Sequence, residues 1–287
     1  MTPKIDSHHH LWLYNPKEYD WIDEPMQAIR RDFLPPHLES EIRACGIDGT
    51  VVVQARQTLE ETNWLLLLAA RNDWMLGVVG WAPLTDPAVP DLLARLREGG
   101  KLKGVRHILQ GEPDPEYMLR EDFNRGIGAL RQLGLVYDIL IYERHLPQTV
   151  RFVDRHPDQV FVLDHIAKPR IREGALSPWR EHIRELARRP NVYCKVSGMV
   201  TEADYRKWTE KQLRPYFDTV VECFGPARLM FGSDWPVCLV ACDYGRWFGI
   251  VRRWIARLSA GEQARILGGT AVEAYKLAGK TDESALH

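Results

Sequence analysis

Two histidines near the start of the chain are the first residues whose types and spacing suggest chemistry. Residues 4–12 read K-I-D-S-H-H-H-L-W, so a short apolar and acidic run leads directly into His8, His9 and His10. Alternate side chains of a strand share a face, which places His8 and His10 on one face and His9 on the other. Two such imidazoles, about 6 to 7 Å apart along the strand, could bind a divalent cation or orient a water molecule. A short expression tag and a plain polar surface are the alternatives, and the strand-like lead favours a functional pair.

The composition predicts a globular chain with a sizeable core. Of the 287 residues, 45% are hydrophobic and 27% are charged, and 38 basic against 39 acidic residues leave a net charge of -1. This balance gives no electrostatic reason to expect nucleic acid or an anionic membrane as a partner. No apolar run reaches the roughly 18 residues that span a bilayer.

The cysteines and the N-terminus indicate the cellular compartment expected for the protein. Five scattered cysteines, an odd number, and an N-terminus without a secretion signal predict reduced thiols in the cytoplasm. Cys238 and Cys242 could form part of a metal clip, but no second pair accompanies them, so packing is the better interpretation.

Short β-rich runs alternate with helical patterns along the chain. Near-continuous apolar runs of this kind suit strands that are covered on both faces. The expected strands are residues 4–10, 49–55, 75–81, 102–107, 134–141, 160–165, 191–196 and 228–234. The expected helices are residues 36–45, 60–71, 90–99, 123–133, 146–156, 179–188, 211–224 and 246–258, with a last one through 263–267 capped by Ser259. Residues 12–34 are too irregular for a regular element and are expected to form a long loop over the end of the first strand.

Eight strands, each followed by a helix, predict an α/β fold of the (β/α)8 TIM barrel type. A doubly wound open sheet is the alternative, but its usual glycine-rich turn after the first strand is histidine-rich here. No internal repeat or linker divides the chain. Residues 1–278 are therefore predicted to form a single domain, and residues 279–287 a disordered tail.

Polar residues collect at the carboxyl ends of the expected strands, where TIM barrels carry their active sites. Imidazoles, carboxylates and cations from distant positions in the sequence would therefore converge on one mouth. In chain order the residues are His8, His10, Gln54, Arg56, Trp81, Arg106, His107, Asp138, Tyr142, His165, Lys168, Lys195, Asp234 and Trp235.

The motifs at these strand ends resemble those of the amidohydrolase superfamily. They read I-D-S-H-x-H-L-W, V-V-V-Q-A, G-W, K-G-V-R-H, L-D-H-x-A-K-P, C-K-V-S-G and F-G-S-D-W-P. More narrowly, the last blocks resemble the sugar-lactone hydrolase branch, that of L-fuconolactonases and L-rhamnonolactonases, which is related to pyrone-dicarboxylate lactonase. The resemblance runs from residue 5 to about residue 277. It implies hydrolysis of a small sugar lactone by attack of water, in an enzyme that is a monomer or a homodimer.

The resemblance also implies a set of metal ligands. His8 and His10 match the histidine pair of the first strand, His165 the histidine of the sixth and Asp234 the aspartate of the eighth, a set that implies one Zn²⁺ ion. Two departures argue against a second ion. Arg106 stands where binuclear relatives carry a bridging lysine, and Asp138 where many carry a histidine. Some lactonases of this branch are thought to need no metal, so the requirement stays open.

The expected mechanism uses Asp234 as general base on a water molecule. His8, His10 and His165 would hold the ion or hydrogen-bond that water directly. Arg106 and His107 would stabilise the charge that grows on the lactone carbonyl oxygen. For each residue there is a structural alternative: a capping or core carboxylate, an imidazole that only supports its neighbours, or an arginine paired with a nearby acid.

The remaining polar and aromatic residues are assigned to substrate binding or to internal support. Indole faces pack on the C–H surfaces of sugars, and amides hydrogen-bond their hydroxyls. Asp138 is interpreted as an internal hydrogen-bond acceptor, and Lys195 as a supporting donor or a surface lysine rather than a catalytic group. The expected substrate-binding residues are Trp12, Gln54, Trp81, Tyr142 and Trp235.

Two other functions compete with lactone hydrolysis. A metal-dependent, non-oxidative decarboxylase of the same superfamily would share the histidine pair and the late aspartate, but normally has a histidine on the fifth strand as well. A barrel that binds a sugar acid without turnover is the third possibility. Release of CO2 from aromatic acids would distinguish the decarboxylase, and saturable binding without ring opening would distinguish the binding protein.

Overall fold

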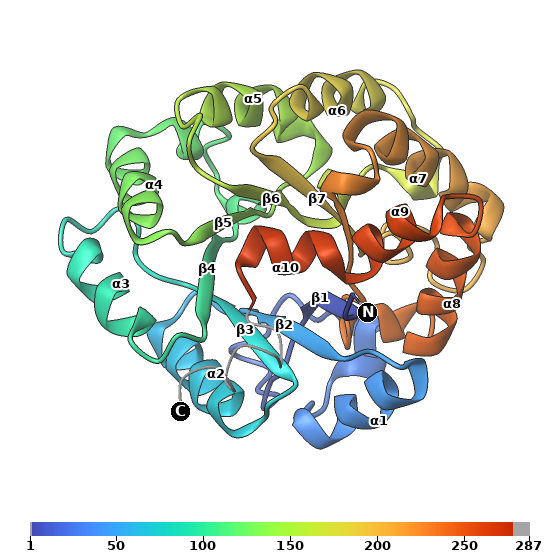
Figure 1. Ribbon diagram of the computed structural model, residues 1–287, viewed down its shortest axis with the longest axis horizontal. Helices are drawn as coiled ribbons and strands as arrows, with labels where there is room; N and C mark the ends of the chain where they lie inside the picture. The colour runs from blue at the N-terminus through green and yellow to red at the C-terminus, as the bar shows by residue number, and fades with distance from the viewer. Residues whose placement is uncertain (1, 278–287) are drawn as a thin grey trace.

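The computed structural model describes residues 2–277 and confirms the predicted barrel (Figure 1). Eight parallel strands are hydrogen-bonded in the order of the sequence. They are β1 (Ile5–His9), β2 (Gly49–Val53), β3 (Met75–Gly80), β4 (Leu102–His107), β5 (Val136–Ile139), β6 (Phe161–Leu163), β7 (Val192–Val196) and β8 (Leu229–Phe231). Each lies inside the range expected for it, and β5, β6 and β8 are markedly shorter, because their ends turn into the loops that carry polar residues.

Most of the helices surround the strands, and α10 lies across one end of the barrel (Figure 1). They are α1 (Pro35–Cys45), α2 (Leu59–Arg71), α3 (Val89–Arg97), α4 (Glu121–Leu133), α5 (Leu146–Asp154), α6 (Trp179–Ala187), α7 (Glu210–Phe224), α8 (Tyr244–Ile255), α9 (Ala260–Ala264) and α10 (Thr270–Tyr275). Ser259 caps α9 as expected, since its side chain accepts a hydrogen bond from the Glu262 backbone N–H.

Two expectations about the ends and loops need correction. Residues 12–34 contain a regular element, the 3-10 helix η1 (Glu24–Ile29), which begins with a proline in its first turn. The last helix continues beyond residue 267, through a π-helical turn (Arg265–Gly269) into α10. The tail expected to be disordered, residues 279–287, lies outside the described residues.

The barrel interior is apolar at the end where the strands begin and polar at the end where they finish. Aliphatic side chains of several strands meet α10 at the end where the strands begin: Ile5, Val51, Val53, Val79, Val136, Val162 and Met230 pack against Ala271, Ala274 and Tyr275. Charged side chains fill the other half, where the strands end. The chemistry therefore lies at the carboxyl end of the barrel, as the architecture requires.

The closure of the barrel brings the first and last strands together. The backbone N–H of Asp234 donates to the His8 carbonyl at 2.8 Å, and that of His10 donates to the Trp235 carbonyl at 2.6 Å. These bonds lie just beyond β8, so they extend the pairing of the first and last strands to the position of His8 and His10. Residues more than 220 positions apart in sequence therefore sit on adjacent backbone segments.

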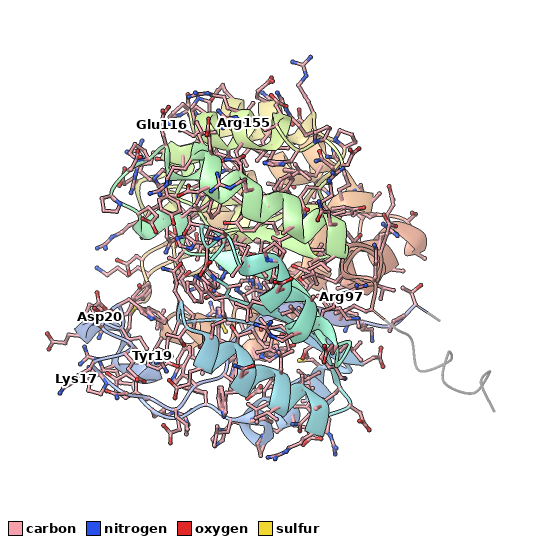
Figure 2. All side chains as sticks on the ribbon, turned by 90° about the vertical axis from the view of Figure 1, so that its left-hand side faces the viewer. Lys17, Tyr19, Asp20, Arg97, Glu116 and Arg155 are labelled. Atoms are coloured by element: carbon pink, nitrogen blue, oxygen red, sulfur yellow. The ribbon has the colours of Figure 1, made fainter. Side chains whose placement is uncertain are left out.

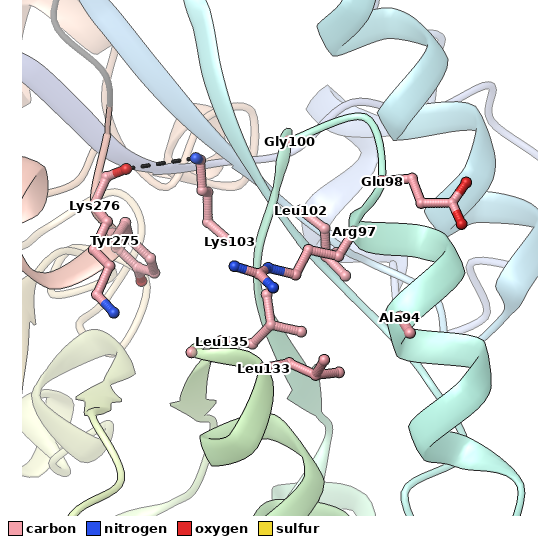
Figure 3. Close-up of a pocket in the computed structure, with 11 residues that line it drawn as sticks. Ala94, Arg97, Glu98, Gly100, Leu102, Lys103, Leu133, Leu135, Tyr275 and Lys276 are labelled. Atoms are coloured by element: carbon pink, nitrogen blue, oxygen red, sulfur yellow. Dashed lines mark hydrogen bonds between the residues drawn. The ribbon is translucent and has the colours of Figure 1, made fainter.

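Loops cover the carboxyl end of the barrel, and α10 closes the opposite end. In Figure 2, Lys17, Tyr19 and Asp20 of the first loop lie on one side of the molecule and Arg97 lies towards the other. At the closed end, the Lys103 ammonium donates to the Lys276 carbonyl at 3.5 Å, beside a cavity of about 470 Å³ (Figure 3).

No helix within residues 2–277 has the length and apolarity needed to cross a membrane.

Two glycines of α4 provide a test of this packing. A Cβ added at Gly126 would lie 2.8 Å from the Leu84 Cβ and even closer to the Leu84 carbonyl oxygen, whereas one at Gly128 meets nothing within 4 Å. Gly126→Ala is therefore expected to lower the free energy of unfolding by about 1–3 kcal/mol. Gly128→Ala, in the same helix, is expected to raise it by about 0.5–1 kcal/mol. Urea denaturation measures both, and equal effects of the two substitutions would contradict the close approach of α4 to Leu84.

Candidate active site

A cavity of about 490 Å³ opens at the carboxyl ends of the strands. Its floor contains His10, Arg106, His165 and Asp234 from four different strand ends. Loop residues form its walls, among them Trp21 and Met26 of the first loop and Ile108, Gln110 and Gly111 after β4. The cavity is therefore a polar floor with partly apolar walls, large enough for a small ring-shaped substrate.

His8, in β1, and His10, directly after this strand, face Asp234 on this floor. The Nε2 atoms of His8 and His10 lie 3.2 Å apart, so the two imidazoles share a face as the strand alternation predicts. The Asp234 Oδ1 atom lies 3.5 Å from the His10 Nε2 and 3.8 Å from the His8 Nε2. His9 points the other way, with its Nε2 2.9 Å from the Thr50 hydroxyl.

Buried hydrogen bonds hold the backbone of this group. The Asp6 carboxylate accepts from the backbone N–H groups of His8 at 3.1 Å and Ser233 at 2.8 Å, so it ties β1 to the turn after β8. The Tyr244 hydroxyl donates to the second Asp6 oxygen at 3.1 Å. Asp234 itself has a φ of +57°, a left-handed conformation that costs a non-glycine residue energy and is frequent at functional sites.

His165 approaches the same aspartate from β6. It belongs to a run of four non-glycine residues with positive φ, from His165 (51°) to Lys168 (47°), which turns the chain sharply at the end of the strand. Its Nδ1 lies 2.9 Å from the Ser197 hydroxyl, and its Nε2 lies 3.9 Å from the Asp234 Oδ1. Space for the imidazole exists because residue 198 is a glycine, where a Cβ would lie 2.5 Å from the His165 Nδ1.

The electrostatics make the imidazoles neutral and Asp234 ionised. Burial lowers the pKa of His8 well below its usual value, lowers that of His10, and lowers that of His165 to about 4. Burial alone would raise the pKa of Asp234, but His165, His10 and the Lys168 ammonium together outweigh it, so the pKa lies below its ordinary value. At neutral pH the site therefore offers uncharged imidazoles and a carboxylate, which are the forms that accept a proton or ligate a metal.

The donor set fits one divalent metal ion. The side chains of His8, His10 and Asp234 offer three ligand atoms within mutual reach. Two nitrogens on one tetrahedral zinc ion would lie about 3.3 Å apart, close to the observed separation of the two Nε2 atoms. The His10 Nδ1 lies 2.8 Å from the Val53 carbonyl, a contact that leaves the Nε2 lone pair free for an ion.

The fourth predicted ligand lies beside this group. His165 joins a second group with His8 and Asp164, but Arg106 and Lys195 already engage the Asp164 carboxylate at 2.9 Å each. Within residues 2–277, the arrangement of side chains thus favours His8, His10 and Asp234 as the metal ligands, with His165 beside them.

Arg106 is held rigidly at the edge of the floor. Its Nη1 donates to the Asp164 carboxylate at 2.9 Å and lies 3.4 Å from the His8 Nε2. Its Nη2 donates to the backbone carbonyl of Gln54 and, at 3.0 Å, to the Gln54 side-chain oxygen. A fixed guanidinium therefore borders the cavity, and Gln54 is occupied in holding it.

The other predicted site residues divide between the cavity and the surrounding structure. Tyr142 lines the cavity. His107 is turned to Glu112, with 2.6 Å between its Nε2 and the carboxylate, and receives a hydrogen bond of 3.4 Å from the Trp81 indole. Within the described chain, the residues lining the cavity do not include Trp12, Gln54, Trp81, His107 and Trp235.

Several site residues were not singled out from the sequence. Asp164, fully buried, contacts His8, Arg106 and Lys195. It stands directly before His165 in the L-D-H motif, and this position could have indicated it. Lys168, by contrast, is one of the strand-end residues predicted from the sequence, and it lines the cavity with its Nζ 4.0 Å from the Glu202 carboxylate. Burial raises the pKa of Glu202. Glu202 and Trp21 come from loops, and no local signal in the sequence marks them.

The barrel and its site define a class: TIM-barrel hydrolases in which a histidine pair at the end of the first strand faces an aspartate after the last. The chain belongs to the amidohydrolase family, whose model matches residues 5–277. It is 42% identical over 285 residues to an L-fucono-1,5-lactonase of Burkholderia multivorans, covering 96% of each chain. It is 37% identical over 281 residues to an L-fucono-1,5-lactonase of Burkholderia ambifaria, covering 96% of this chain and 97% of the other.

A solved structure shows the same architecture. The crystal structure of an amidohydrolase from Burkholderia multivorans with bound zinc matches with a TM-score of 0.92 at 42% identity, over 96% of this chain and all of the other. The resemblance inferred from the strand-end motifs is thereby confirmed.

Proposed function

We propose that the protein is a lactonase that opens a small sugar lactone, with L-fucono-1,5-lactone as the first candidate substrate. The observation that carries this proposal is the Asp234 carboxylate, which faces neutral imidazoles on the floor of a cavity sized for one sugar ring. The two curated lactonases that align over nearly the whole chain support the substrate class.

Water activation is assigned to Asp234. A carboxylate with a lowered pKa remains ionised across the neutral range and can accept a proton from a water within hydrogen-bond reach. The neutral imidazoles of His10 and His165, both near the Asp234 Oδ1, would orient that water towards the lactone carbonyl carbon. The protonated Asp234 would then return the proton to the ring oxygen as the ester bond breaks.

Arg106 would stabilise the developing oxyanion. Its hydrogen bonds to Asp164 and Gln54 hold it in place before substrate binds, and preorganised charge of this kind is effective in a site shielded from water. The Lys168 ammonium, which also lines the cavity, is a second cation for the substrate's oxygen atoms. His107 has no part in this proposal, because Glu112 and Trp81 engage it outside the cavity lining.

We assign one divalent cation to His8, His10 and Asp234, and zinc is the ion found in the related crystal structure. When bound, such an ion supplies Lewis acidity that lowers the pKa of water and polarises a carbonyl.

A panel of sugar lactones, with acid release followed by a pH indicator, tests the proposal. We expect rapid ring opening of L-fucono-1,5-lactone and slower opening of lactones with other hydroxyl configurations. The same assay after chelation assigns the role of the imidazoles. Loss of activity that zinc restores indicates a required ion, and activity that persists indicates that the imidazoles act on the water directly. Failure to open any lactone, with CO2 release from an aromatic acid, would identify a decarboxylase instead.

A further inference from the structure

We infer that Tyr275, Asp138 and Lys195 form a buried positioning column that holds His8 in place from the closed end of the barrel. The three residues belong to α10, β5 and β7, and all are fully or almost fully buried. The inference rests on the proposed function, because it assigns a purpose to charged groups that lie beneath the site. It gives α10 a role in positioning a residue of the active site, in addition to closing the barrel.

The lower part of the column connects α10 to β5. The Tyr275 hydroxyl lies 2.9 and 2.8 Å from the two carboxylate oxygens of Asp138. Its ring crosses the apolar half of the interior, where it packs with Ala271 and Ala274 against the strands. A hydroxyl placed at the end of such a ring satisfies the carboxylate without requiring water in the barrel.

The upper part connects Asp138 to His8 through Lys195. The Lys195 Nζ lies 2.5 Å from the Asp138 Oδ2, 2.9 Å from the Asp164 Oδ1 and 3.1 Å from the His8 Nδ1. An ammonium group has three protons, and three acceptors surround this one. The charges also balance, since Lys195 and Arg106 offset Asp138 and Asp164 in a region that excludes water.

This arrangement fixes which way the His8 ring faces. The His8 Nδ1 faces the Lys195 ammonium at 3.1 Å and the Asp164 carboxylate at 3.3 Å. The His8 Nε2 faces the His10 Nε2 at 3.2 Å. His10 in turn donates from Nδ1 to the Val53 carbonyl. The column therefore holds His8 in a single ring orientation, with its Nε2 directed towards His10 and Asp234.

Tyr275→Phe tests the column, because it removes one hydroxyl and keeps the ring that fills the barrel. We expect kcat to fall about 10-fold with KM within about twofold, the size typical of a lost partner behind a functional histidine. We also expect the 15N resonances of the His8 imidazole in chelator-treated, histidine-labelled protein to shift from their wild-type values, because Lys195 would no longer be held in one position against the His8 Nδ1. The His8 signals are assigned by their loss in His8→Gln.

Tyr193→Phe is the matched control. Its hydroxyl also bonds α10, at 2.8 Å from the Glu273 carboxylate, but on the outside of the barrel. It should leave kcat and the His8 resonances as in the wild type. Asp138→Asn is a second variant in case the first folds poorly, and combined with Tyr275→Phe it should cost little more than the larger single effect, because both act through one chain of contacts.

The outcomes separate this inference from the proposed function. A wild-type His8 spectrum and kcat in Tyr275→Phe would overturn the column, even if the protein opens lactones as proposed. Loss of stability alone, with unchanged His8 resonances, would likewise reduce Tyr275 to a packing role. The spectrum can be read whether or not a lactone is turned over.

Discussion

Asp234→Asn is expected to lower kcat by about a thousandfold or more, with little change in KM. An amide cannot accept a proton from water at neutral pH, so the general-base contribution is lost, and the preorganised carboxylate that faces the imidazoles is lost with it. Steady-state kinetics on the preferred lactone measure this effect. The uncharged amide is nearly the same size, so the fold should remain intact.

Asp243→Asn is the control for this substitution. Asp243 lies nine residues further along the chain, where its side chain accepts a hydrogen bond from the Arg246 backbone and caps α8. Asparagine caps helices about as well as aspartate, so both stability and turnover should be unchanged. Near-normal turnover in Asp234→Asn would remove this carboxylate from the mechanism and require another base.

Gly198→Ala is expected to produce the second large effect, through His165. The added Cβ would lie 2.5 Å from the His165 Nδ1 and 2.7 Å from its Cγ, so the imidazole must move and its contact with Ser197 must break. We expect kcat/KM to fall about 100-fold, since a displacement of about 1 Å at a reacting group has consequences of this size. The free energy of unfolding should fall as well, because Gly198 has a φ of +62°.

Gly174→Ala separates the two causes. Gly174 has a φ of +66°, but a Cβ there would meet nothing within 4 Å. This variant should therefore carry the backbone cost of about 1–2 kcal/mol without loss of activity. If Gly198→Ala behaves like Gly174→Ala in both stability and kinetics, His165 does not depend on the space beside it.

The architecture could be predicted from the sequence because its signals are local. The strands are near-continuous apolar runs and the helices are periodic, and eight alternations of the two permit few folds. The pairing of His8 with His10 follows from strand alternation alone, and the approach of Asp234 follows from the rule that strand ends share one mouth. These inferences require no knowledge of which side chains contact which.

The assignments of individual roles were less predictable, because they depend on contacts between distant segments. Arg106 and His107 are neighbours on β4, yet Gln54 and Asp164 hold the first beside the cavity while Glu112 draws the second away. The Trp81 indole donates a hydrogen bond to His107 and does not line the cavity. A local pattern can place a residue at a strand end, but the partners it meets decide where its side chain points.

The sequence by itself therefore determined the barrel, the histidine pair and the aspartate opposite it, because each follows from a backbone periodicity or from the common direction of parallel strands. Only the tertiary structure decided that α10 closes the barrel and that Tyr275 reaches Asp138 through its interior. It alone also decided that Lys195 is a buried support for His8 and that loop residues such as Trp21 and Glu202 form the cavity walls. These contacts join segments that are far apart in the chain, and their geometry is set by packing, for which no periodicity exists.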